Sequence, residues 1–108
     1  MSDVTNVILN MGVMTEEEAK DMLQKVNAFF DGRQRGFISM DDEALPSGWY
    51  GGSKMLECDL AIGAFNHLNL AGLIEHIRSL SWSLHQDTQL MIKEQNDDRF
   101  RIINVFPD

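Results

Sequence analysis

Cysteine and long apolar runs are scarce in this chain of 108 residues. Cys58 is the only cysteine, which excludes an internal disulfide, a CxxC redox pair and a zinc ribbon. No apolar run approaches the roughly 20 residues that span a bilayer, and Met1 to Val4 lack the basic start of a secretory signal. A free thiol without such a signal predicts a protein of the reducing cytoplasm.

Basic residues are also few, since nine Lys and Arg stand against seventeen Asp and Glu and give a net charge of −8. A field of this sign repels phosphate backbones and anionic lipids, so we expect neither a nucleic acid nor a membrane as partner. The same field attracts a basic protein surface and speeds its encounter with the chain. The alternative is that the acidic surface serves solubility alone.

Motifs that mark active sites and cofactor sites are missing from the sequence. There is no GxSxG elbow, SxxK pair, GxGxxG turn, P-loop or HExxH motif. His67, His76 and His85 recur every nine residues, a spacing that matches neither a helix face nor a strand face. We therefore expect no metal, no cofactor and no catalytic residues.

Hydrophobic periodicity predicts one α+β domain over residues 1–108. The helix signal is sharpest where Thr15 and Glu18 form a capping box ahead of an apolar stripe, and Asn69 is a plausible N-cap for a second helix. The expected elements are strands at 4–11, 37–40, 54–65, 89–95 and 99–106, and helices at 15–31 and 69–80. This order predicts a two-layer sandwich, with two helices on one face of a mainly antiparallel sheet, in a ferredoxin-like β-α-β-β-α-β order with an extra C-terminal strand.

The predicted strand at 54–65 alternates between two faces. Its apolar face would hold Leu56, Cys58, Leu60 and Ile62, which makes Cys58 an inert core thiol. Its other face would hold Glu57 and Asp59, about 7 Å apart at strand spacing.

The open face of the sheet is therefore a candidate site. Besides Glu57 and Asp59 it would carry Lys93 and Arg101 from the terminal strands. Three interpretations remain open: routine cross-strand ion pairing, a small-ligand site, or a carboxylate pair for acid–base catalysis.

A long irregular segment at 33–53 is the second candidate. Asp41, Asp42 and Glu43 form an acidic run, and Trp49 and Tyr50 follow between glycines. Aromatic anchors beside charges are typical of interface hot spots. The alternative is that the two rings fold back onto the sheet edge, and both interpretations apply equally to Trp82 in a later loop.

The leading functional hypothesis is a non-enzymatic acidic interaction protein. One form of it is an inhibitor or immunity-type protein that occludes the cationic site of a basic partner. The alternative from another class is a small-ligand-binding regulatory domain, a homodimer, that uses the open sheet face. An enzyme built on Glu57 and Asp59 is the third hypothesis.

Overall fold

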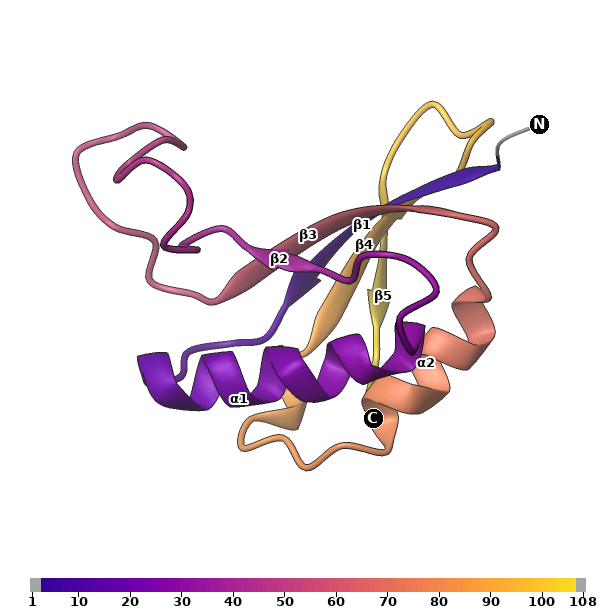
Figure 1. Cartoon of the computed structure of the whole chain (residues 1–108), viewed down its shortest axis with the longest axis horizontal. Helices are drawn as coiled ribbons and strands as arrows, with labels where there is room; N and C mark the ends of the chain where they lie inside the picture. The colour runs from indigo at the N-terminus through magenta and orange to yellow at the C-terminus, as the bar shows by residue number, and fades with distance from the viewer. Residues whose placement is uncertain (1–2, 107–108) are drawn as a thin grey trace.

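A computed structural model describes residues 3–106 of the chain, so the predicted domain of 1–108 extends beyond the described part at both ends. The elements are β1 (Val4–Asn10), α1 (Glu16–Asn27), the 3-10 turn η1 (Ala28–Phe30), β2 (Ile38–Ser39), β3 (Leu60–Asn66), α2 (Leu70–Arg78), the 3-10 turn η2 (His85–Asp87), β4 (Gln89–Lys93) and β5 (Arg101–Asn104). Neighbouring strands pair antiparallel in the order β2-β3-β1-β4-β5. Both helices lie on the same side of this sheet (Figure 1). The predicted α+β arrangement of two helices and an antiparallel sheet is confirmed.

Local signals set the start of each helix, as predicted. The Thr15 hydroxyl accepts a hydrogen bond from the Glu18 amide at 3.2 Å, and the Glu18 carboxylate accepts one from the Thr15 amide at 3.4 Å. The Asn69 side chain accepts from the Gly72 amide at 3.1 Å. These contacts satisfy amides that have no partner within the first helical turn.

The hydrophobic core lies between the sheet and the two helices. Strand β1 alternates strictly, with Thr5, Val7 and Leu9 buried toward the helices. Helix α1 contributes Met22 and Val26, and α2 contributes Leu73 and Ile77. Every second residue of the strand and every third or fourth residue of each helix therefore points into this core.

An aromatic cluster fills the core where α1 ends beside β3. The Phe30 and Phe65 rings stack with centroids 4.5 Å apart, and Phe37 meets Phe65 edge-on at 5.0 Å. Gly63 leaves room for Phe65, since a Cβ built at Gly63 would lie 2.3 Å from the Phe65 ring. The cluster fastens α1 and β2 to the same edge of the sheet.

The prediction for the strand at 54–65 is wrong in both its start and its facing. Strand β3 begins at Leu60, and its buried residues are Ala61 and Phe65, while Leu60 and Ile62 lie on the opposite face. The cause is the pairing with β1, which sets Ala61 beside Leu9 and Gly63 beside Val7 under the helices. The small residues Ala61 and Gly63 leave room for the large Phe65 ring. The register with β1, and not the hydrophobicity of Leu60 and Ile62, therefore decides which face of β3 is buried. Cys58 consequently lies half-buried in a loop rather than in a core strand.

Candidate functional site

The segment between β2 and β3, Met40–Asp59, is the most prominent irregular part of the structure. It projects beyond the end of the sheet, on the far side from α2 (Figure 1). We call it the projecting loop. Its base is fastened by backbone hydrogen bonds from Met40 to Leu60 at 2.9 Å, from Asp59 to Gly12 at 2.7 Å and from Met11 to Asp59 at 2.8 Å. It therefore includes most of the predicted 33–53 segment but runs further, because residues 54–59 are not a strand.

Trp49 and Tyr50 organise the interior of the projecting loop. The Trp49 indole donates to the Met40 carbonyl at 2.7 Å, yet 43% of the Trp49 residue stays exposed. The Tyr50 hydroxyl accepts from the Leu56 amide at 3.1 Å and donates to the Asp41 carboxylate at 3.3 Å. The two rings meet edge-on with centroids 6.0 Å apart. Thus Tyr50 holds the loop together, and Trp49 presents a fixed, half-exposed ring.

The three acidic residues that the sequence singled out lie on this loop in different settings. Asp41 is exposed and contacts Tyr50, while the half-buried Asp42 accepts from the Ala44 amide at 2.8 Å and shapes a turn. Glu43 is exposed and pairs with Lys20 of α1 at 3.1 Å. The hydrogen bond with Glu43, together with that of Glu16, raises the pKa of Lys20. The structure thus brings Asp41 to Tyr50 and links Glu43 to the start of α1.

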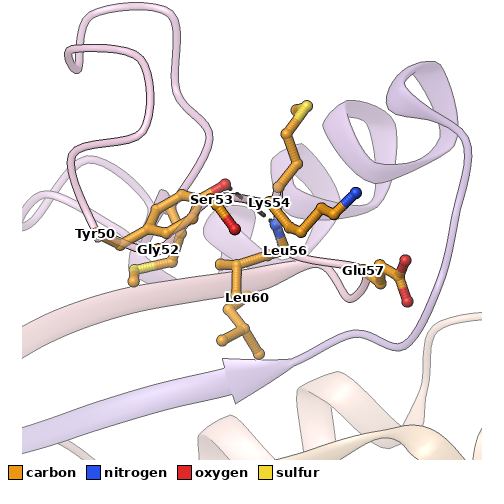
Figure 2. Close-up of a pocket in the computed structure, with 10 residues that line it drawn as sticks. Tyr50, Gly52, Ser53, Lys54, Leu56, Glu57 and Leu60 are labelled. Carbon is orange, nitrogen blue, oxygen red and sulfur yellow. Dashed lines mark hydrogen bonds between the residues drawn. The ribbon is translucent and has the colours of Figure 1, made fainter.

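A shallow cavity of about 630 Å³ opens inside the projecting loop. Figure 2 shows the Tyr50 hydroxyl directed at the Leu56 amide across it, while the Glu57 side chain points away from the ring. The floor is Leu60 at the start of β3. The remaining lining includes the polar residues Ser53, Lys54 and Glu57.

Asp59 fastens the end of the projecting loop to the turn before α1. Its carboxylate accepts a hydrogen bond from the Met14 amide at 2.9 Å. Burial raises the pKa of Asp59, the hydrogen bond from Met14 opposes this shift, and the nearby charge of Asp41 adds to it. Asp59 therefore has a structural function in this loop.

The predicted grouping of Glu57, Asp59, Lys93 and Arg101 on one sheet face is wrong. Glu57 and Asp59 precede β3 and lie in the loop. Lys93 pairs with Asn6 on the face away from the helices, whereas Arg101 pairs with Ile92, whose side chain is buried on the helix side. Arg101 forms its ion pair with Glu94 at 3.3 Å. The four residues therefore do not share one face of the sheet, as the ligand-binding hypothesis expected.

Trp82 is part of the core rather than of a binding surface. Only 5% of the residue is exposed, and its indole donates to the Ile77 carbonyl at 2.8 Å. Of the two interpretations of this ring, the structure selects the buried one. The residue covers the C-terminal end of α2.

An apolar row that the sequence did not predict lies on the face of the sheet that the helices leave uncovered. Strand register aligns one apolar residue from each strand on this open face. The row comprises Ile38, Ile62, Ile8, Met91 and Ile102. Side chains alternate between the two faces along any strand, but only the register could show that these five positions line up.

The described residues carry no sign of a metal centre or of a membrane span. Between residues 3 and 106, no three His, Cys, Asp or Glu side chains are placed to hold a metal ion together. Within the same range, no helix has both the length and the apolar character to cross a bilayer. Comparison of the chain with protein families, curated proteins and solved structures found no match.

Proposed function

We propose that this protein is a non-enzymatic interaction protein that binds a basic protein through the projecting loop. The observation that carries the proposal is the half-exposed Trp49 ring, held in place by its own hydrogen bond beside exposed carboxylates. The loop contributes five of the seventeen acidic residues and a single lysine. A basic surface is the natural complement of such a site.

In this proposal the acidic residues and Trp49 have different functions in binding. Asp41 and Glu43 are exposed and would steer a cationic surface toward the loop. Trp49 would then anchor the complex with little loss of side-chain entropy, because its indole N–H is already satisfied and its ring is already fixed. One consequence of such binding would be that the loop covers the partner's cationic site, as an inhibitor or immunity-type protein does.

The test is affinity capture from source-cell lysate at low and at moderate salt, followed by binding kinetics with the captured protein. We expect capture of a basic protein whose association rate falls as salt rises. Trp49→Ala should raise the dissociation rate about 30-fold, as loss of an anchor worth about 2 kcal/mol would. The Asp41→Asn/Glu43→Gln double variant should instead slow association.

Matched controls lie elsewhere on the surface. Leu84 is 38% exposed, similar to Trp49, so Leu84→Ala controls for loss of a half-exposed apolar group. Glu75 on α2 is exposed, so Glu75→Gln controls for removal of one negative charge. A captured protein that the loop variants and the control variants retain equally would contradict the proposal, as would binding that is indifferent to salt.

We also propose that the arrangement is a ferredoxin-like order extended by β5. The element order β1-α1-β2-β3-α2-β4, with β2, β3, β1 and β4 as successive neighbours in the sheet, supports this. An experimental structure with other neighbours for β1 would contradict it.

A further inference from the structure

The open face of the sheet has the composition of a protein interface. The apolar row runs across all five strands through its centre, and Ile102 at one end of the row is 62% exposed. Phe100, 44% exposed, lines a shallow cavity of about 750 Å³ together with Ile8 and Ile62 of the row. Amide side chains flank the row on neighbouring positions, such as Asn10, which donates to Gln89 across β1 and β4 at 3.0 Å. An apolar centre with an uncharged polar rim is typical of subunit contacts.

Charge decides which occupant fits this face. Among the strand residues that lie on it, none is Asp or Glu, and Lys93 at the end of β4 carries the one charge. The net charge of −8 is therefore carried elsewhere, much of it by the projecting loop. A basic partner finds no complement here. Two copies of this acidic chain, by contrast, meet at these strand residues without bringing carboxylates together. The carboxylate of Asp42 lines the cavity beside the row, where Arg35 is also part of the lining.

The size of the face is also adequate for a second copy. Strand β1 has seven residues, which gives a length of about 24 Å, and five strands give a width of about 24 Å. Because β2, β4 and β5 are shorter, the 25 strand residues together cover a projected area of only about 400 Å², and protruding side chains raise the accessible area above it. Standard interfaces bury about 800 Å² per partner and weak ones less than about 600 Å², so the face is of the size expected for a weak symmetric dimer.

We propose that two copies of this protein form a homodimer by stacking their open sheet faces, with the apolar row at the centre of the contact. The two-fold contact would place Ile8 and its neighbours in the row against the same residues of the second copy. The open face adjoins the projecting loop at Asp42, which lines the cavity beside the row, but the row and Trp49 lie on different elements. Separate variants therefore test the dimer and the basic partner.

The test is the molar mass of the chain in solution, measured by light scattering and sedimentation over a wide concentration range. We expect a concentration-dependent rise from 12.3 kDa toward twice that mass. Ile102→Glu should raise the dissociation constant at least tenfold, because each dimer would then bury two unpaired carboxylates. Met91→Lys, in the same row, should weaken the dimer as well. Circular dichroism would establish that both variants fold.

Val13→Glu is the matched control, since Val13 is 65% exposed and lies outside the sheet. It should leave the dimer unchanged, as should Trp49→Ala in the projecting loop. A wild-type mass that stays at 12.3 kDa up to about 1 mM, the weak end of the affinity scale, would overturn the proposal. So would a dimer that Ile102→Glu leaves intact, or a monomer that binds another protein through Ile102.

Discussion

At the residue scale, Asp59 was a candidate for catalysis in the sequence but stabilises the projecting loop in the structure. The sequence places it two residues from Glu57, a spacing that suits paired carboxylates on a strand. In the structure its carboxylate accepts from the Met14 amide, and burial raises its pKa. Burial therefore makes protonation of this carboxyl group easier in the folded protein than in the unfolded chain.

That shift predicts a pH effect for Asp59→Asn. Because the folded-state pKa is raised, the stability that Asp59 contributes is greatest below its ordinary pKa of 3.8 and declines as pH rises through the raised value. Asparagine keeps an oxygen for the Met14 amide but never ionises. Urea unfolding should therefore show a larger advantage of Asp59→Asn over wild type near about pH 7 than near about pH 3. A constant difference across that range would contradict the predicted shift.

Gly63 gives a second prediction at this scale. A methyl group there would meet the Phe65 ring at 2.3 Å, so Gly63→Ala should lower the free energy of unfolding by about 1–3 kcal/mol. Thermal or urea unfolding would measure the loss. The Gly63→Ala/Phe65→Leu double variant should lose less than the sum of the two single variants, because the shorter side chain relieves the clash. Strict additivity would show that the two sites are uncoupled.

The projecting loop is the element whose structure depends most on a few polar contacts. Its base is held by backbone hydrogen bonds, and its interior is bridged by the Tyr50 hydroxyl between Asp41 and Leu56. An irregular segment with so few apolar contacts lies at the low-stability end of a structure. It is also where binding residues are commonly found.

Tyr50→Phe should loosen this loop without unfolding the protein. The variant loses both hydroxyl contacts, and a net loss of about 1 kcal/mol would raise the open fraction of the loop about fivefold. Trypsin cleavage after Lys54, which is exposed in the loop, should accelerate by the same factor. Cleavage after Arg33 serves as the internal control, and equal acceleration at both sites would indicate general unfolding instead.

At the scale of the whole molecule, the surplus of negative charge opposes folding. The chain measures 38 × 29 × 28 Å, and the Debye length is about 30 Å at 0.01 M salt, so charges across the entire molecule repel one another at low salt. The ion pairs of Lys20, Lys25 and Arg101 are exposed and contribute little in return.

Screening should therefore stabilise the protein. Raising sodium chloride from about 0.01 M to about 0.15 M should increase the melting temperature by about 2–4 °C, the shift that roughly 0.5 kcal/mol gives in a domain of this size. Calorimetry at several protein concentrations would separate this effect from dimer formation. A falling melting temperature would mean that attractive pairs outweigh the net repulsion.

Much of the architecture could be read from local signals in the chain. The capping box at Thr15, the Asn69 cap and the β-rich run at 7–9 are short-range features, so the element types and their order were predictable. The acidic run and the Trp49–Tyr50 pair likewise marked the projecting loop before its shape was known. These features depend on neighbours in sequence, which act in any fold.

What the sequence by itself determined, then, is the kind and order of the elements, the acidity of the chain and the place of its long loop. The tertiary structure decided the facing of β3, the burial of Trp82 and the alignment of the apolar row across the open face. The physical reason is that these features depend on strand register and on which side chain fills a shared space. Ala61 and Gly63 are buried because β1 lies beside them and Phe65 needs the room, a condition that no local pattern contains.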